Sequence, residues 1–523
     1  MVENRSYPLY SLAEFKHLCE LISMKAKSQP DDISFAWIER EKECQVTYKQ
    51  FAEDVYNSSR IIKERINIPS HIGLLGNNSY QWLVLFAAII DSGNVVVALD
   101  KDMLAEEYDE IMDRLDVTAV YADKKHIEFA RLNTNGQAVF SMEEGVPCDR
   151  PPFEDEILFN NPDVDSPACV FLTSGTSGKR KGVVLSHRNL AADIINTCKM
   201  VNVPDTSLAV LPFHHTFGLT ASIWMVFNYG HPIYISQGVR YLPKEMSVAK
   251  PQTMLLVPLY VENFYKQIMM KVKAAKKTTV FNILHGISFV LFSVGIDCRR
   301  KIFKTVLNSF GGRLDTIICG GAALDPLYIK KFRQFGIEIL NGYGTTECSP
   351  VAAVNRNLYH KDGTVGLPIP NTDITVDENG EVIVSGDHVM VGYYHDEDAT
   401  QEVLHGGRYY TGDLGYIDAE GFLVLTGRKK NLIILSSGEN VSPEELEEKL
   451  LRIEGIDEVI VSEKDQKLSA TIYSENMDEN QKEIISEKIE QLNKTLPMYK
   501  RITAVYYSKE PFKKTTTMKI IRS

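Results

Sequence analysis

The sequence predicts an α/β protein whose sheets are largely parallel. From about residue 45 onward, short apolar runs typical of buried strands alternate with longer segments of helical periodicity. This alternation is typical of α/β domains. At 523 residues the chain is too long for one hydrophobic core, so we expect several subdomains.

The first α/β region predicts a large sheet. Its apolar strands are expected at 72–75, 95–99, 117–123 and 168–173. A helix between the first two strands begins near Asn78 or Ser79, because both residue types are common N-caps.

The second α/β region contains apolar runs at 233–238 and 253–258 and at the starts of 315–336 and 337–347. Asp325 and Pro326 have the residue types of an N-cap and a first helical position. Gly320, Gly321 and Ala322 should therefore lie at the carboxyl end of a strand. Open α/β sheets bind their ligands at this edge.

The sequence pattern changes after residue 373. Short alternating runs with Asp-Glu-Asn-Gly and Asp-Ala-Glu-Gly turns predict a small antiparallel, barrel-like subdomain over 373–427. Polar residues 428–430 indicate a domain boundary. Beyond it, a small α+β domain is predicted from a helix at Ser442–Glu445, strands near 457–462, 468–473 and 502–507, and a helix over about 480–495.

Composition excludes several classes of protein. Apolar residues make up 44% and charged residues 24%, close to the averages for folded proteins. The net charge of −12 argues against nonspecific binding of nucleic acid. The eight cysteines are scattered singly, and the N-terminus lacks the apolar core of a signal peptide. We therefore expect a reduced, cytoplasmic location.

One apolar segment, 278–296, is bounded by cations on both sides. Four lysines precede it and three cations follow it: Lys271, Lys273, Lys276, Lys277, Arg299, Arg300 and Lys301. A buried or half-buried helix, an interfacial helix and a membrane span are the alternatives, and Asn282 and His285 argue against the span. A peripheral membrane contact through 278–296 is thus one prediction.

A short basic loop at 173–182 concentrates glycines, hydroxyls and cations. Close backbone approach, N–H and hydroxyl donors and positive charge are typical of an anion site, and phosphate is the usual anion. The Walker spacing is absent, because Arg180 occupies the position of its second glycine and "KGVVLS" reads as a strand. The loop should lie between two strands, and a basic surface turn is the alternative.

Six segments together resemble the AMP-forming acyl-CoA synthetases of the adenylate-forming superfamily, most closely the long-chain fatty acyl-CoA ligases. They are "TSGTSGKRKG" (173–182), "PFHHTFGL" (212–219), "NGYGTTE" (341–347), "YYTGDLGYID" (409–418), "GRKKNLIILSSGENVSPEELE" (427–447) and "KTTTMKIIR" (514–522). The resemblance implies two steps: a carboxylate attacks the α-phosphorus of MgATP, and a thiol such as that of CoA then displaces AMP. ATP, Mg²⁺ and CoA are the implied cofactors and co-substrate.

The resemblance assigns nucleotide contacts to four segments. The phosphate loop would contribute Thr173, Ser174, Gly175, Thr176, Ser177, Gly178 and Lys181. The adenine and α-phosphate region would include Gly321, Ala322, Tyr343, Gly344, Thr345 and Thr346. Glu347 is the implied metal ligand, since a hard oxygen suits Mg²⁺. Asp413 and Arg428 would hold the ribose.

The resemblance also implies a mobile C-terminal domain over 431–523 that follows an N-terminal domain over 1–427 and a hinge at 428–430. Lys519 would neutralise charge between the carboxylate and the α-phosphate. Met518 replaces the glycine usual before this lysine, and Lys514 is the alternative. Lys430 occupies the pivot position, and 436–441 would face the site in the second orientation.

The acid is expected to be a medium-to-long-chain fatty acid. His214 and His215 follow Phe213 where amino-acid-activating relatives have an aspartate, so this segment has no carboxylate to bind the ammonium group of an amino-acid substrate. One of these histidines would line the acyl channel; a core histidine is the alternative. The insertion at 265–312 resembles extra helices of long-chain ligases. Two other functions stay open: loading of a separate acyl carrier protein, and a non-catalytic binding scaffold.

Overall fold

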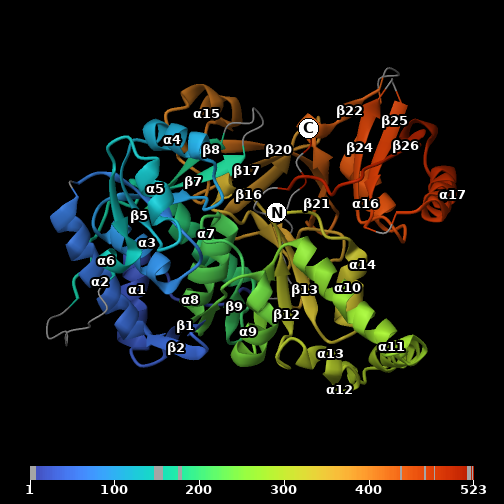
Figure 1. Ribbon diagram of the computed structural model, residues 1–523, viewed down its shortest axis with the longest axis horizontal. Helices are drawn as coiled ribbons and strands as arrows, with labels where there is room; N and C mark the ends of the chain where they lie inside the picture. The colour runs from blue at the N-terminus through green and yellow to red at the C-terminus, as the bar shows by residue number, and fades with distance from the viewer. Residues whose placement is uncertain are drawn as a thin grey trace. The chain divides into compact units, whose positions relative to one another are not determined.

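The computed structural model describes residues 8–66, 68–146, 157–174, 180–435, 439–464, 467–475, 477–514, 520 and 522, without the side chain of Ser174 (Figure 1). Its contacts divide the chain into two compact units. The first contains Met1–Asp373 and Val384–Tyr409, and the second contains Ile374–Ile383 and Tyr410–Ser523.

A seven-stranded sheet forms part of the first unit and confirms the first α/β region. Its strands in spatial order are β18 (Gly392–Tyr393), β8 (Arg180–Ser186), β7 (Pro167–Ser174), β4 (Val95–Leu99), β3 (His71–Leu75), β5 (Val117–Ala122) and β6 (Ala138–Ser141). The strands from β7 to β6 pair in parallel, whereas β8 is antiparallel to both β7 and β18. Helix α3 (Tyr80–Asp91) begins at Ser79, whose side chain accepts a hydrogen bond from the Trp82 N–H.

A nine-stranded sheet forms the second α/β region. Its order is β15 (Leu367–Pro368), β14 (Ala353–Val354), β13 (Glu338–Tyr343), β12 (Thr316–Cys319), β11 (Thr253–Leu256), β9 (Ser207–Ala209), β10 (Ile233–Ile235), β1 (Ile33–Glu39) and β2 (Lys42–Thr47). Pairing is parallel from β13 to β1. Helix α14 (Pro326–Arg333) has Asp325 as its N-cap, as predicted.

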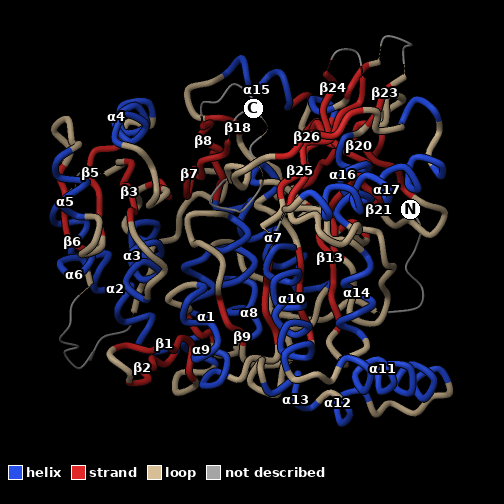
Figure 2. Tube along the Cα trace, turned by 45° about the vertical axis from the view of Figure 1, so that its right-hand side comes forward, coloured by secondary structure: helices blue, strands red, loops and turns tan. Residues whose placement is uncertain are grey.

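Helices pack between the two sheets and on their outer faces (Figure 2). The inner set comprises α1 (Leu18–Ser28), α2 (Tyr48–Arg65), α3, α7 (His187–Met200), the π-helical η1 (Phe217–Met225) and α8 (Val226–Tyr229). Aromatic rings join them: Phe86 of α3 lies 6.2 Å from Trp224 of η1, and Phe227 of α8 lies 5.8 Å from Phe35 of β1. This aromatic core fixes the two sheets of the first unit against each other.

The outer helices complete the first unit. They are α4 (Ala105–Arg114), α5 (Ile127–Leu132), α9 (Leu242–Ala249), α14 and α15 (Glu397–Val403), whereas the short α6 (Met142–Gly145) packs against α2 and α3. The insertion at 265–312 folds as the end of α10 (Pro258–Ala274), followed by α11 (Thr278–Ser293), α12 (Arg299–Ile302) and α13 (Lys304–Asn308). Phe281 and Leu284 of α11 pack against the core beside the nine-stranded sheet, so α11 is a half-buried helix. Among the described residues, no helix has the length and apolar character needed to cross a membrane.

The predicted antiparallel region is confirmed by its strand pairs. In the first unit, β19 (Leu404–His405) runs antiparallel to the start of β20 (Arg408–Ile417). In the second unit, the rest of β20 runs antiparallel to β21 (Leu423–Arg428). The remaining strands of this region are β16 (Thr372–Val376) and β17 (Glu381–Gly386).

The C-terminal part of the second unit has the predicted α+β elements. They are β22 (Ile433–Ile434), β23 (Asn440–Val441), α16 (Pro443–Leu451), β24 (Glu458–Lys464), β25 (Lys467–Tyr473), α17 (Glu479–Thr495) and β26 (Ala504–Tyr507). Strand β25 pairs antiparallel with β24 and parallel with β26. Ser442 is the N-cap of α16, but its hydroxyl donates to Glu444 Oε2 at 3.0 Å and does not cap the helix.

Candidate active site

The predicted phosphate loop joins two strands, as expected from its sequence. Strands β7 and β8 pair antiparallel up to Thr173↔Lys181 and Ser174↔Arg180. This hairpin differs from a Walker loop, which leads into a helix. Four predicted phosphate contacts, Gly175, Thr176, Ser177 and Gly178, lie outside the described residues.

Arg180 at the base of the hairpin is held by two carboxylates. Its Nη1 lies 2.9 Å from Asp100 Oδ2, and its Nε lies 2.5 Å from Glu107 Oε1. Asp100 follows β4 directly and is buried. Burial opposes ionisation of Asp100, but His214, the Asp102 N–H and the Arg180 guanidinium together keep its pKa below the usual value. Asp100 therefore fixes the end of the hairpin as a buried anion. Sequence reasoning missed it, although an acidic residue directly after a buried strand is a recognisable signal.

The Tyr393 side chain connects the phosphate hairpin to the predicted metal ligand, Glu347. Lys181 Nζ lies 4.6 Å from the centroid of the Tyr393 ring, and the Tyr393 hydroxyl donates to Glu347 Oε1 at 2.8 Å. Burial, followed by the charge of Glu347, raises the pKa of Tyr393, so its hydroxyl stays protonated and donates. Sequence reasoning missed Tyr393 as well, because the two-residue strand β18 gives no periodic signal.

Glu347 meets the requirements of a magnesium ligand. It is buried, its Oε1 accepts a hydrogen bond from the Tyr393 hydroxyl, and no ion pair joins either of its oxygens to a lysine or arginine among the described residues. The described part of the chain contains no cluster of three His, Cys, Asp or Glu side chains suited to a metal. Mg²⁺ is commonly held by one or two carboxylates together with substrate phosphates and water. A single buried carboxylate next to a phosphate-type hairpin fits that pattern.

The turn after β13 carries the rest of the predicted nucleotide contacts. Tyr343 is buried at the end of the strand, and Thr345 and Thr346 are partly exposed. A Cβ on Gly344 would lie 1.7 Å from the Pro350 carbonyl oxygen, so only glycine fits there. Beside this turn in the sheet, β12 ends just before Gly321 and Ala322, which are exposed. The structure thus places both glycine-rich turns at the carboxyl edge of one parallel sheet.

The two predicted acyl-site histidines differ in their surroundings. His214 is buried, with its Nε2 3.4 Å from Asp100 Oδ1, and His215 is partly exposed. The two ring centroids are 4.3 Å apart. Burial lowers the pKa of His214 to about 4, so the ring is neutral at pH 7. Because Asp100 contacts both Arg180 and His214, it links the phosphate hairpin to the predicted acyl segment.

The second unit carries the predicted ribose contacts. Asp413 on β20 is paired in register with Arg428 on β21, and Arg428 Nε lies 2.7 Å from Asp413 Oδ1. Asp413 is buried, which leaves a carboxylate in a defined orientation. Partial burial lowers the pKa of Lys430.

Of the two candidate catalytic lysines, Lys514 lies within the described residues. Lys514 Nζ is 2.6 Å from Glu458 Oε1, and Glu458 also accepts from the Phe512 N–H at 2.7 Å. Lys514 thus has a structural partner within the second unit, which argues against it as the catalytic amine. Lys519 and Met518 lie outside the described residues, as do 436–438 of the segment 436–441.

Comparison with known proteins identifies the family. The model of the AMP-binding enzyme family matches residues 22–394, and the chain belongs to this family. The long-chain-fatty-acid–CoA ligase FadD15 of Mycobacterium bovis is 25% identical over 482 residues, covering 84% of this chain and 79% of the relative. The chloroplastic long-chain-fatty-acid–[acyl-carrier-protein] ligase AEE15 of Arabidopsis thaliana is 26% identical, covering 90% and 78%.

Solved structures share the fold. The o-succinylbenzoate CoA synthetase MenE of Bacillus subtilis, in complex with its acyl-adenylate, aligns with a TM-score of 0.74 at 19% identity, covering 96% of each chain. The anthranilate CoA ligase AuaEII aligns with a TM-score of 0.78 at 18% identity, covering 98% of this chain and 96% of that one. The predicted α/β architecture and the resemblance to adenylate-forming enzymes are confirmed.

Proposed function

We propose that this enzyme activates a medium-to-long-chain fatty acid with ATP, forms an acyl-adenylate, and transfers the acyl group to the thiol of CoA. AMP and pyrophosphate are released. The observation that carries the proposal is the Lys181–Tyr393–Glu347 arrangement beside the phosphate hairpin. The fatty-acid ligases among the relatives support the choice of acid.

The chemical requirement is to hold charged groups in line. A carboxylate is a poor electrophile, and joining it to AMP supplies a good leaving group. Lys181 and the backbone of the hairpin would bind the β- and γ-phosphates, while Thr346 would donate its hydroxyl to the α-phosphate. Mg²⁺ held by Glu347 would neutralise phosphate charge. Asp413 and Arg428 would orient the ribose.

The neutral His214 suits an apolar acyl group. A neutral, buried imidazole adds no charge to the site, whereas an aspartate there would attract an ammonium. In the proposed enzyme, Asp100 holds this ring and Arg180 in one geometry. Tyr343 would stack against adenine, next to the close turn at Gly344 and beside Gly321 and Ala322.

The acceptor thiol has a second candidate. The AEE15 relative is named for loading acyl carrier protein, which favours the carrier-bound phosphopantetheine thiol as the alternative to CoA. The third candidate function is a scaffold that binds nucleotide or an acyl group without catalysis; it rests on Met518, which replaces the glycine usual before the catalytic lysine.

ATP–pyrophosphate exchange over a panel of fatty, aryl and amino acids tests the acid. We expect exchange with fatty acids of medium to long chain. Exchange with amino acids alone would refute the choice of acid, and exchange with no acid would favour the scaffold. Product analysis with CoA and with a carrier protein then identifies the acceptor.

The catalytic lysine has its own test. Lys519→Met should slow acyl-adenylate formation by about 10²–10³-fold, as expected for loss of a charge that stabilises the transition state. Lys514→Met should retain most of the rate, because Lys514 is paired with Glu458. Lys513→Met, at an exposed neighbouring position, is the matched control. Equal rates for Lys519→Met and the native enzyme would contradict the assignment.

A further inference from the structure

The outward face of α11 carries a continuous row of exposed aliphatic side chains, here called the aliphatic stripe. Its members follow one another at three or four positions and are Val280, Ile283, Ile287 and Val290 of the helix and its C-cap residue Val294. This spacing places them on one side of the helix. Between 47% and 66% of each residue is exposed. Single exposed aliphatics are ordinary, but a contiguous row on one helix indicates an interaction surface.

The opposite face of α11 is packed. Phe281 and Leu284 contact the core beside the nine-stranded sheet, and Ser288 is buried. The aliphatic stripe is therefore not a core face that another part of the first unit covers. Phe289 and Phe292 are also exposed, but the helical period places them on a different side of α11 from the stripe, beyond the packed residues.

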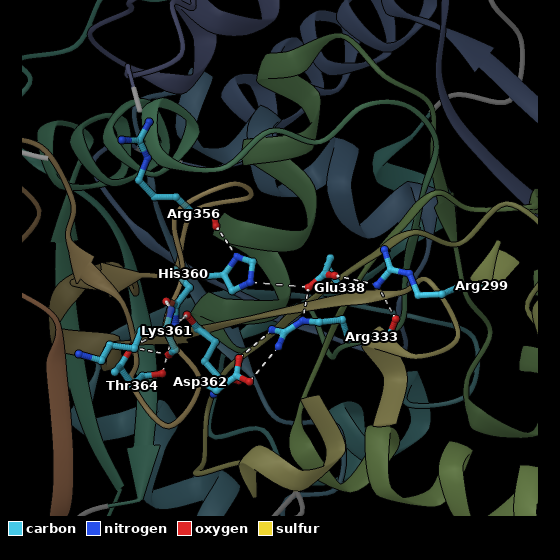
Figure 3. A network of polar contacts seen from close by, with 10 residues as sticks. Arg299, Arg333, Glu338, Arg356, His360, Lys361, Asp362 and Thr364 are labelled. Atoms are coloured by element: carbon cyan, nitrogen blue, oxygen red, sulfur yellow. Dashed lines mark hydrogen bonds and ion pairs between the residues drawn. The ribbon is translucent and has the colours of Figure 1, made fainter. Parts of the chain in front are cut away.

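The end of α11 is fixed by the residues that follow it. The Arg299 guanidinium lies 3.8 Å from the centroid of the Phe292 ring, pairs with Asp297 at 2.8 Å and donates to the Arg333 carbonyl oxygen. Arg333 in turn pairs with Glu338 at 3.0 Å and with Asp362 at 2.7 Å (Figure 3). Arg300 donates to backbone carbonyl oxygens. Arg299 and Arg300 thus make intramolecular contacts that stabilise the end of α11, and the orientation of the stripe does not depend on a binding partner.

The cations that face solvent are lysines at both ends of α11. They are Lys271, Lys273, Lys276 and Lys277 before the helix and Lys301 and Lys304 after it. No aspartate or glutamate occurs from residue 263 to 296, although the whole chain has a net charge of −12. The apolar surface thus lies in a locally basic region of an acidic protein.

We propose that the aliphatic stripe and its flanking lysines dock this protein on the surface of an anionic lipid bilayer, with α11 lying in the interface. At about 1.5 Å per residue, the 16-residue helix is about 24 Å long, shorter than the roughly 30 Å hydrocarbon core. Apolar side chains insert at the boundary of headgroups and acyl chains, while each lysine near an anionic surface adds about 1 kcal/mol of attraction.

A second copy of the chain fits this surface less well. A two-fold contact through α11 would bring two sets of lysines together without acidic partners in this segment. An anionic bilayer supplies both the apolar interior and the opposite charge. This argument is independent of the acid that the enzyme activates.

Sedimentation with vesicles tests the proposal on the full-length protein. We expect binding to phosphatidylcholine vesicles that contain phosphatidylglycerol, weaker binding to pure phosphatidylcholine, and loss of binding as salt rises. The triple variant Ile283→Ser/Ile287→Ser/Val290→Ser should lower the partition coefficient at least about tenfold. The matched control Leu132→Ser/Leu158→Ser changes two exposed leucines elsewhere and should bind as the native protein does.

Two further measurements separate docking from misfolding and from a failed substrate assignment. The stripe variant should keep its melting temperature and its rate of ATP–pyrophosphate exchange on a water-soluble short-chain acid. Ile287→Trp, within the stripe, should show a blue shift of tryptophan emission on addition of anionic vesicles. Vesicle binding that is equal in the native protein and the stripe variant, or absent in both, overturns the proposal. A concentration-dependent dimer that the stripe variant abolishes, without vesicle binding, assigns the surface to a second copy and also overturns it.

Discussion

Asp100 contacts both the base of the phosphate hairpin, through Arg180, and the predicted acyl segment, through His214. Asp100→Asn removes the charge that Arg180 faces at 2.9 Å, leaving Glu107 as its charged partner among the described residues. We expect kcat/KM for ATP to fall about tenfold or more, because a small displacement of phosphate-binding groups has large kinetic effects. Steady-state kinetics with ATP varied provide the measurement.

The control for Asp100 is its neighbour Asp102, which is exposed and pairs with Lys101. Asp102→Asn should leave the kinetics unchanged. If Asp100→Asn altered only the melting temperature and left KM and kcat intact, Asp100 would be structural and would not position the site.

A second prediction at the level of a single residue concerns Asp193 and the dependence of protein stability on pH. It is fully buried in α7, and burial raises the pKa of its carboxyl well above the ordinary value. The hydrogen bond that it accepts from the Val351 N–H lowers the pKa, but by less than burial raises it. Between the unfolded and folded pKa values, the folded state keeps a proton that the unfolded state has released. Stability therefore falls as pH rises above about 4.

Asp193→Asn retains the acceptor for Val351 and removes the titration. We expect the variant to melt above the native protein by about 2 °C or more at pH 8, with the difference shrinking toward pH 4. Thermal unfolding followed by circular dichroism at several pH values measures this. A difference that grew as the pH fell would have the wrong sign and refute the assignment.

The turn after β13 makes a prediction at the scale of the element. Gly344→Ala would force a Cβ against the Pro350 backbone, whereas the nearest contact of a Cβ at Gly342 is an ordinary 3.4 Å. We expect Gly344→Ala to lose about 3 kcal/mol of stability or to displace the turn and abolish adenylation. Gly342→Ala, two residues away, is the control. Denaturant unfolding and ATP–pyrophosphate exchange check both variants, and equal behaviour of the two would contradict the geometry.

Strands buried on both faces could be predicted, whereas most strands of two or three residues could not; an exception is β10 (Ile233–Ile235), which lies within the predicted run 233–238. The predictions at 95–99, 117–123 and 253–258 agree with β4, β5 and β11 to within two residues, because a central parallel strand is a continuous apolar run. Strand β1 (Ile33–Glu39) lies before residue 45, outside the segments in which the sequence predicts strands. Strands of two or three residues such as β9, β14 and β18 are too short to show a period.

The candidate site could be predicted only where its residues are part of a local motif. The hairpin, the turn after β13 and the pairing partners Asp413 and Arg428 follow from contiguous segments. Asp100 and Tyr393 are brought in by tertiary packing, and Tyr393 reaches Glu347 across 46 positions of the chain. The position of Asp100 directly after β4 is a local signal that it lies at the ligand-binding edge of the sheet, but its partners Arg180 and His214 are not apparent from the sequence; Tyr393 carries no local signal.

The whole molecule consists of two compact units, with the last boundary in the chain between Tyr409 and Tyr410. The hinge at 428–430 is a separate prediction, because it concerns where the chain turns and not where contacts are densest. The two statements are compatible if the segment after residue 430 has a core of its own. Such a core is visible: its buried apolar residues all lie between Ile433 and Ile502.

We therefore expect residues 431–523, expressed alone, to fold. The segment contains the sheet β24–β25–β26 with α16 and α17, and it is longer than the roughly 40 residues below which an isolated core usually fails. Thermal unfolding by circular dichroism should show one cooperative transition, and amide resonances should be dispersed.

Substitutions at two leucines of α16 distinguish a fragment with a specifically packed core from a fragment that has merely collapsed. Leu446 is fully buried, and Leu446→Ser should abolish the transition, since it removes a large apolar side chain and places a hydroxyl in the core. Leu451, in the last turn of the same helix, is 47% exposed, and Leu451→Ser should change the melting temperature little. A fragment without a cooperative transition would mean that this core depends on β20 and β21. The boundary near Tyr409 would then be the only one at which the C-terminal part could move as a body, and the proposed pivot at Lys430 would be wrong.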